Sequence, residues 1–274
     1  MRSPRRRSDM RRILVLLGLS ALALLPAPAM ATSEPPATSE PGALDDFVIQ
    51  ISFEGGLIPQ EFAFVNTPAL VVTDDGRVVV PGAIPAIYPG PLVPVLTQRS
   101  ITDEGVQAYL DLAEEHGLLE HRTYEGNDLI MDAGFAVVRI KVDGEEYVHS
   151  AYALGYDDES DPDRAELQDF VEQALDPATL AGGELGEEVP FESDSYLVLA
   201  YESDPIEADP EPAPEVVAWP SDASVRLSDA SVCAELPYDE VVDVMGTATQ
   251  LTWFEDGGVT YRVAATPRLP GRGC

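Results

Sequence analysis

The chain has 274 residues, with 16 basic against 49 acidic side chains and a formal net charge of −33. Such a surface repels phosphate backbones and anionic lipid, which excludes electrostatic binding to nucleic acid or to an anionic membrane. The apolar content of 45% is that of a globular chain, and two cysteines are too few for a disulfide-dense miniprotein or a multi-cysteine zinc site.

Residues 1–31 have the three-part pattern of a secretory signal peptide. Six arginines precede an uninterrupted run of 13 apolar or small residues, Ile13–Leu25, and Ala29-Met30-Ala31 matches a cleavage site. A membrane span needs roughly 20 residues, so we expect cleavage and no membrane anchor afterwards. Arg11-Arg12 also resembles a twin-arginine signal, which leaves the export route open. We therefore expect a secreted protein, extracellular or in the cell envelope.

Two segments rich in proline and acidic residues divide the remaining chain. Residues 32–46 are predicted to form a disordered linker, and residues 202–215 (ESDPIEADPEPAPE) a second, acidic linker. We expect an α+β domain over 47–201 and a smaller C-terminal subdomain over 216–274.

Hairpin signals dominate the larger domain. Apolar strands are expected at 47–53 and 196–201. β-Branched runs flank the Asp-Gly turns at 74–76 and 143–144, which is the strongest short-range hairpin signal. In the second hairpin, apolar residues alternate with Arg139 and Lys141, so we expect one face of this sheet to be wet.

Two main helices are expected among these hairpins. Residues 102–116 repeat apolar side chains at three- and four-residue steps, and Gly117 ends the pattern. The second helix starts at Asp161-Pro162, a capping residue before a proline, and is closed by Asp176-Pro177. Hairpins with inserted helices, and no βαβ rhythm, predict an α+β fold with a largely antiparallel sheet.

The C-terminal subdomain is expected to be a small hairpin unit closed by a disulfide. A strand near 224–227, a helix near 238–245 and a hairpin turning on Gly257-Gly258 are predicted. Cys233 and Cys274 enclose the hairpin, and a bridge that closes a loop of roughly 42 residues is worth about 4 kcal/mol. Internal pairing is favoured in an exported chain with two cysteines. The alternative is that Cys274 pairs with another molecule.

The three histidines match no catalytic motif. His116 and His121 lie five residues apart across a helix end, whereas zinc ligands on one helix face are three or four apart. Solvated helix-end histidines are therefore favoured over a metal site. His149 and Ser150 are adjacent on a predicted strand and point to opposite faces, and the Gly-x-Ser-x-Gly elbow of hydrolases is absent. No catalytic residue is predicted.

The acidic run before the second helix resembles a calcium loop. An EF-hand requires glycine and glutamate where this run has Pro162 and Gln168. Weak calcium binding outside that pattern is one interpretation, and no other cofactor is expected. The other interpretation is an acidic helix entry that stabilises the positive end of the helix dipole. The candidate ligands are Asp157, Glu159, Asp161 and Asp163.

Residues 81–94 (PGAIPAIYPGPLVP) are apolar, proline-rich and uncharged in an otherwise acidic chain. Stiff, extended backbone with exposed apolar side chains is typical of recognition loops. The alternative is a packed connection with Ile84, Ile87 and Tyr88 pointing inward, because long apolar connections usually pack. The candidate binding residues are Ile84, Ile87, Tyr88, Pro89 and Pro91.

Several stretches resemble uncharacterised exported bacterial proteins of unknown function. The resemblance spans most of residues 50–274 and lies in turn and packing motifs, so it implies no activity. Many of those proteins look lipid-anchored, and this chain has no lipidation cysteine after its apolar run. The stretches are Gly55-Gly-Leu-Ile-Pro59, Thr73-Asp-Asp-Gly-Arg-Val78, Ile87-Tyr-Pro-Gly-Pro91, Tyr152-Ala-Leu-Gly155, Gly257-Gly-Val-Thr-Tyr-Arg262 and Pro267-Arg-Leu-Pro270.

These patterns favour a non-catalytic exported protein that binds an unknown protein or an envelope component. The acidic surplus is explained by solubility, by tolerance of calcium or high salt, or by attraction to a basic partner. One alternative is a secreted hydrolase with two carboxylates, which requires acids roughly 5 to 10 Å apart in an aromatic-lined cleft. A calcium-dependent envelope protein is the other.

Overall fold

The computed structural model describes residues 46–84, 86–126, 130–156, 161–182, 185–203 and 213–274. All of them belong to one compact unit of the chain, Pro41–Cys274. The predicted signal peptide lies outside these ranges. So do residues 32–45 of the first linker and 204–212 of the second.

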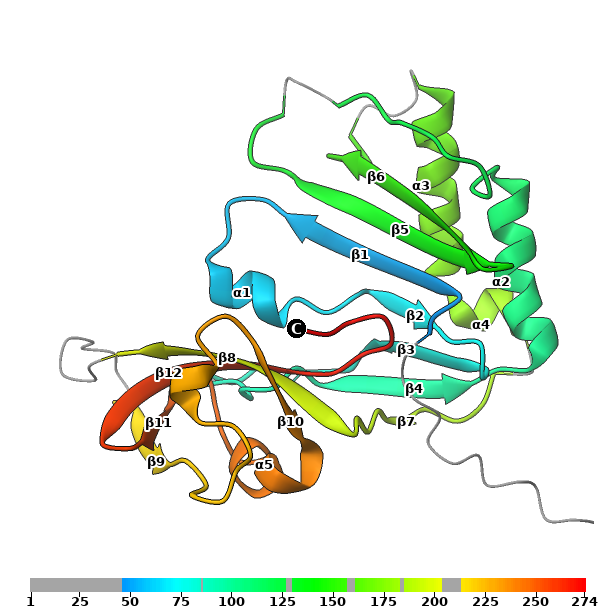
Figure 1. Cartoon of the computed structure of the whole chain (residues 1–274). Coiled ribbons are helices and arrows are strands. Elements are labelled where there is room, and N and C mark those ends of the chain that lie inside the picture. Colours follow the sequence, from blue (N-terminus) through cyan, green and yellow to red (C-terminus); the bar gives the residue numbers. More distant parts are fainter. Residues whose placement is uncertain (1–45, 85, 127–129, 157–160, 183–184, 204–212) are drawn as a thin grey trace, which may run out of the picture. The chain divides into compact units, whose positions relative to one another are not determined.

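The first sheet has seven strands in the order β6-β5-β1-β2-β3-β4-β7, and every neighbouring pair is antiparallel (Figure 1). Both predicted hairpins are confirmed, with β2 beside β3 and β5 beside β6. Gly76 and Gly144 in their turns have φ values of 79° and 81°, which glycine adopts without strain. The strands are β1 (Ile49–Gly55), β2 (Leu70–Val72), β3 (Arg77–Pro81), β4 (Leu96–Ser100), β5 (Gly134–Val142), β6 (Glu145–Tyr152) and β7 (Val189–Pro190).

The second sheet has five strands in the order β10-β8-β12-β11-β9. Its pairs are antiparallel except β9 with β11, which run parallel. β8, which the sequence groups with the larger domain, lies between β10 and β12 and so belongs to the sheet of the C-terminal residues. The strands are β8 (Ser195–Glu202), β9 (Glu215–Ala218), β10 (Ala234–Pro237), β11 (Thr252–Asp256) and β12 (Val259–Pro267).

Two 13-residue helices, α2 (Asp103–Glu115) and α3 (Pro162–Ala174), cover one face of the first sheet (Figure 1). The short α4 (Pro177–Leu180) follows α3. As predicted, the Asp161 side chain caps the start of α3 by accepting backbone N–H bonds, and the Thr102 side chain caps α2 in the same way. The core between helices and sheet includes Ile49, Ile51, Val138, Ile140, Tyr109, Leu112, Leu167 and Phe170.

The second sheet buries one face under α5 (Tyr238–Met245), which coincides with the predicted C-terminal helix. The strand predicted near 224–227 is wrong, because Leu227–Asp229 is a 3₁₀ helix. The buried Asp256 carboxylate accepts the Leu227 backbone N–H at 2.8 Å and pairs with Arg226, which holds the segment in a turn. This interaction joins residues 30 positions apart, so no local pattern signals it.

The predicted disulfide Cys233–Cys274 is present. The segment before Cys274 also reaches the first sheet, where Leu269 is buried with Phe47, Val71 and Val79 on the face away from α2 and α3. The C-terminal residues are therefore held both by the disulfide and by this small cluster. Together the two sheets confirm the predicted α+β class.

Candidate functional site

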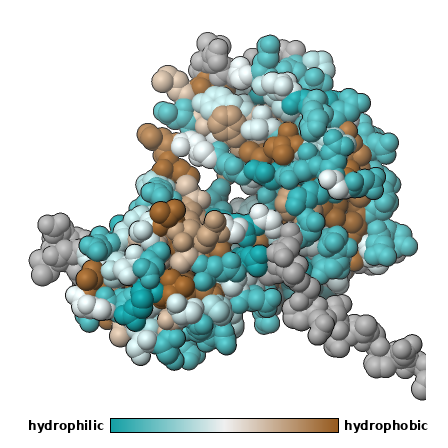
Figure 2. Space-filling model, in the orientation of Figure 1, coloured by the Kyte–Doolittle hydropathy of each residue, from teal (hydrophilic) through white to brown (hydrophobic). Residues whose placement is uncertain are grey.

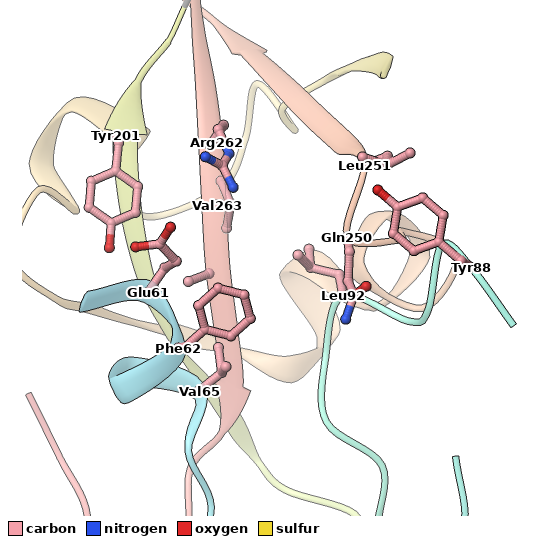
Figure 3. A pocket seen from close by; sticks show the side chains of 11 residues that line it. Glu61, Phe62, Val65, Tyr88, Leu92, Tyr201, Gln250, Leu251, Arg262 and Val263 are labelled. Atoms are coloured by element: carbon pink, nitrogen blue, oxygen red, sulfur yellow. The ribbon is translucent and has the colours of Figure 1, made fainter. Parts of the chain in front are cut away.

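A pocket of about 270 Å³ lies between α1 (Gln60–Val65) and the predicted recognition loop. Figure 3 shows α1 on one side of it, Tyr88, Leu92 and Gln250 on the other, and β12 between them. We call it the α1 pocket. It is lined by Glu61, Phe62, Val65, Tyr88, Leu92, Tyr201, Gln250, Leu251, Arg262, Val263 and Ala264.

The loop 81–94 divides into an exposed half and a packed half. Ile84, Ile87 and Tyr88 are 57%, 66% and 66% exposed, so the interpretation that they point inward is wrong. Residues 89–94 lie closer to the protein, and Leu92 packs against the core of the second sheet. Of the five candidate binding residues, Tyr88 alone is among those that line the α1 pocket.

Backbone hydrogen bonds fix the packed half of this loop to the second sheet. The Leu92 N–H donates to the Ala248 carbonyl at 3.0 Å, and the Gln250 N–H donates to the Gly90 carbonyl at 3.0 Å. These bonds hold Leu92 and Gln250 on the same side of the α1 pocket as Tyr88 (Figure 3). The aromatic wall is thus anchored within two residues of Tyr88.

The opposite wall is α1, a six-residue helix. It is too short to show a repeating apolar pattern, so the sequence did not predict it. Contacts with two other segments hold its carboxyl end, where Asn66 is the C-cap residue. The Arg272 guanidinium donates to the carbonyls of Phe64 and Asn66, and the Asn66 side chain donates to the Phe53 carbonyl at 2.6 Å. The Arg272 bonds satisfy free carbonyls at the helix end, and the Asn66 bond ties that end to β1. They hold Phe62 at the pocket with 58% of its surface exposed.

Exposed apolar side chains continue from α1 into the segment before it. Leu57 is 87% exposed and Ile58 is also exposed. Figure 2 shows hydrophobic atoms gathered where the β1–α1 segment and α1 lie in Figure 1. The apolar surface near the pocket is therefore larger than the pocket itself.

Three of the polar side chains that line the α1 pocket, Glu61, Tyr201 and Arg262, have no hydrogen-bond or ion-pair partner within the described residues. Tyr201 and Arg262 are opposite each other in the β8–β12 register, so they share one face of the sheet. The Tyr201 hydroxyl is buried without a hydrogen-bond partner. Glu61 and Arg262 form no hydrogen bond or ion pair within the described part of the chain, with each other or with any other group.

Burial raises the pKa of Tyr201, and the Glu61 carboxylate raises it further. The phenol therefore stays protonated at neutral pH and can donate a hydrogen bond. In Figure 3 its oxygen points toward Glu61, and Arg262 extends from the neighbouring strand. The α1 pocket thus combines apolar walls with a cation, an anion and the protonated phenol of Tyr201.

A second, polar hollow of about 500 Å³ lies on the wet face of the first sheet. We call it the wet-face hollow. Arg139 and Lys141 line it, which confirms that they lie on the solvent side of the hairpin. Its cations have partners, because Arg139 pairs with Glu146 at 3.4 Å and Lys141 with Asp46 at 2.7 Å, while Arg272 bonds to the α1 carbonyls.

His116 corrects one expectation, because this helix-end histidine is buried rather than solvated. Its Nδ1 lies 2.6 Å from Glu166 Oε2 and its Nε2 lies 3.1 Å from Gln173 Nε2. Both partners are on α3, which packs beside the end of α2 and excludes water from the ring. His121 is exposed and lies 3.6 Å from Glu145.

His149 is fully buried away from both hollows. Its Nε2 is 2.8 Å from the Leu118 carbonyl, which only accepts, so Nε2–H is the donor and Nδ1 accepts from the Tyr124 hydroxyl at 2.8 Å. Burial lowers the pKa of His149. The ring is therefore a neutral structural link, and Ser150 is exposed on the other face as expected.

The acidic run before α3 is described only in part. Asp157 and Glu159 lie outside the described residues, so weak calcium binding there stays a prediction. Asp161 accepts the Asp163 and Arg164 N–H groups, and Asp163 pairs with Arg122 at 3.1 Å, as an acidic helix entry requires. Where the structure is described, no group of three or more His, Cys, Asp or Glu residues could hold a metal ion.

Sequence reasoning missed Glu61, Phe62, Tyr201 and Arg262. One signal was available, because Arg262 interrupts an apolar strand in a chain with ten basic residues after position 31. In the described parts of the chain, no helix is long and apolar enough to span a bilayer. Searches with family models, among curated proteins and among solved structures found no match to this chain.

Proposed function

We propose that this is an exported binding protein that uses the α1 pocket to hold a ligand with an apolar portion. Export is supported by the signal-peptide pattern of residues 1–31 and by the Cys233–Cys274 disulfide, which is typical of oxidising compartments. The observation that carries the binding proposal is the α1 pocket itself, an apolar concavity with convergent polar groups.

The two aromatic walls support this proposal because they are exposed and yet held in place. Phe62 and Tyr88 come from separate segments, and each is positioned by hydrogen bonds next to it in the chain. A ligand that covers such rings gains hydrophobic free energy without first having to order the walls. At about 270 Å³ the pocket lies just below the range of roughly 300–1,000 Å³ for drug-sized ligands, so the ligand is small.

The two-carboxylate hydrolase is less well supported by this geometry. The α1 pocket contributes one carboxylate, Glu61. The wet-face hollow has Glu54 and Glu146, but Ser52 donates to Glu54 at 2.6 Å and Arg139 pairs with Glu146. Binding requires no such pair of acids, and we therefore develop binding rather than hydrolysis.

The test is a fluorescence titration with the uncharged apolar probe N-phenyl-1-naphthylamine. We expect saturable binding to the wild type and about tenfold weaker binding to Tyr88→Ala, because losing part of an aromatic contact costs about 1.4 kcal/mol. Ile87→Ala is the matched control, since Ile87 is equally exposed in the same loop but does not line the pocket.

Equal affinity for Tyr88→Ala and Ile87→Ala would contradict the proposal, as would a probe that never saturates. Thermal unfolding of the three proteins provides the folding control. Both substituted side chains are exposed, so their melting temperatures should match that of the wild type.

A further inference from the structure

Arg262 differs from every other basic residue that the structure describes. All ten basic residues after position 31 are described. Seven form ion pairs with carboxylates, and two, Arg164 and Arg272, donate to backbone carbonyls. Arg262 has neither kind of partner in the described part of the chain, although acids are abundant. The seven paired residues are Arg77, Arg99, Arg122, Arg139, Lys141, Arg226 and Arg268.

The groups around Arg262 also have no protein partner within the described residues. Tyr201, opposite it on β8, has a buried hydroxyl with no hydrogen-bond partner in the part of the chain that the structure describes. Buried polar groups are nearly always paired, so an orphan hydroxyl at a pocket requires an explanation. Glu61, across the pocket on α1, has no ion pair within the described ranges. A cation, an anion and a donor therefore face one apolar hollow and leave one another unpaired.

We propose, building on the function proposed above, that the α1 pocket binds a zwitterion with an apolar side chain. The ligand is an apolar α-amino acid, or the same charged groups at the ends of a short peptide. Its carboxylate would pair with Arg262 and accept from the Tyr201 hydroxyl, and its ammonium group would pair with Glu61. Its side chain would lie among Phe62, Val65 and Leu92.

Charge balance favours a zwitterion over a singly charged ligand. An anion would leave Glu61 facing a like charge and would approach against the field of a chain with net charge −33. A cation would leave Arg262 with a like charge beside it. A zwitterion neutralises both groups and carries no net charge, so the acidic surface does not repel it.

The experiment is isothermal titration calorimetry with three related probes. L-phenylalanine has both charges, phenethylamine lacks the carboxylate, and 3-phenylpropionate lacks the amine. We expect L-phenylalanine to bind the wild type at least tenfold more tightly than either analogue. Because the probes share a phenylethyl group and differ in which charged groups they carry, this comparison needs no substituted protein.

Two substitutions then assign each charge to its partner. Arg262→Gln removes the partner of the carboxylate, so this variant should no longer bind L-phenylalanine more tightly than phenethylamine. It should still bind L-phenylalanine more tightly than 3-phenylpropionate, which lacks the amine. Glu61→Gln removes the partner of the ammonium group, so it should abolish the preference for L-phenylalanine over 3-phenylpropionate and keep the preference over phenethylamine. Arg99→Gln is the control, because Arg99 is a half-exposed arginine outside the α1 pocket, and it should keep both preferences.

The outcomes separate this inference from the proposed function. If N-phenyl-1-naphthylamine binds through Tyr88 but the three phenyl probes bind equally or not at all, the zwitterion inference is overturned and the apolar site stands. If neither N-phenyl-1-naphthylamine nor L-phenylalanine shows saturable binding, both the proposed function and the zwitterion inference are overturned. The tripeptide Gly-Phe-Gly distinguishes the sources, since tighter binding than L-phenylalanine assigns a peptide and weaker binding assigns a free amino acid.

Discussion

The two hollows beside α1 contain similar groups but leave them in different states. In the α1 pocket, Glu61, Tyr201 and Arg262 have no partner in the described part of the chain. In the wet-face hollow, Arg139, Lys141 and Arg272 are all bonded to acids or carbonyls. The bonded groups of the wet-face hollow thus maintain the fold, while the unbonded groups of the α1 pocket are available to a ligand.

The largest effect on stability is expected when a paired group of the wet-face hollow is removed. Arg272→Ala should lower the free energy of unfolding by about 2 kcal/mol, because charged hydrogen bonds to the Phe64 and Asn66 carbonyls are lost. Arg139→Ala, which breaks one partly exposed ion pair, should cost less than about 1 kcal/mol. Urea denaturation measures both, and equal costs would show that Arg272 does not hold α1.

His149 is another hydrogen-bonded group, and it lies away from both hollows. Burial lowers its pKa in the folded state, so the unfolded chain binds a proton first as the pH falls. The stability from neutral His149 is complete above the unfolded pKa of about 6.5 and declines below it, by at most about 1.4 kcal/mol per pH unit.

The measurement is the free energy of unfolding between pH 7.5 and pH 5.5. His149→Gln should flatten its pH dependence, whereas His121→Gln, at an exposed ring, should leave the slope unchanged. Identical slopes in the two variants would mean that His149 is not the titrating group.

The smallest effect on stability is expected at an unpaired group. Tyr201→Phe removes a hydroxyl that has no partner, so stability should change by less than about 0.5 kcal/mol, while binding of L-phenylalanine weakens. Tyr124→Phe is the contrasting tyrosine, since it breaks the bond to His149 Nδ1 and should cost about 1 kcal/mol or more. Thermal unfolding compares them, and a costly Tyr201→Phe would mean that this hydroxyl is bonded after all.

The fold was predictable where the signal is local. Short stretches of sequence contain the Asp-Gly turns and the capped starts of α2 and α3. The pairing of Cys233 with Cys274 was predicted from the oxidising compartment that the signal-peptide pattern implies. The place of β8 in the second sheet was not predictable, because it depends on the pairing of β8 with β12. This pairing sets Tyr201 opposite Arg262, which is far away in the chain. The same long-range register creates the polar side of the α1 pocket.

The candidate site was therefore predictable only in part. Composition identified the 81–94 loop, and Tyr88 proved to line a pocket, while the equally exposed Ile84 and Ile87 did not. Whether an exposed side chain in that loop meets a pocket depends on α1, whose position is set by Arg272 some 200 residues later. The prediction that His116 is solvated was wrong for a similar reason, because α3, distant in the sequence, covers the ring.

The buried cluster shared by Phe47 and Leu269 has a consequence for folding. It joins residues from the two ends of the described chain, so the first sheet cannot complete this part of its core until the segment around Leu269 has been synthesised. Contacts of such long sequence separation form late and slow the search for the native state. A nascent chain thus stays incompletely folded at this part of the first sheet until its last residues are available to pack there.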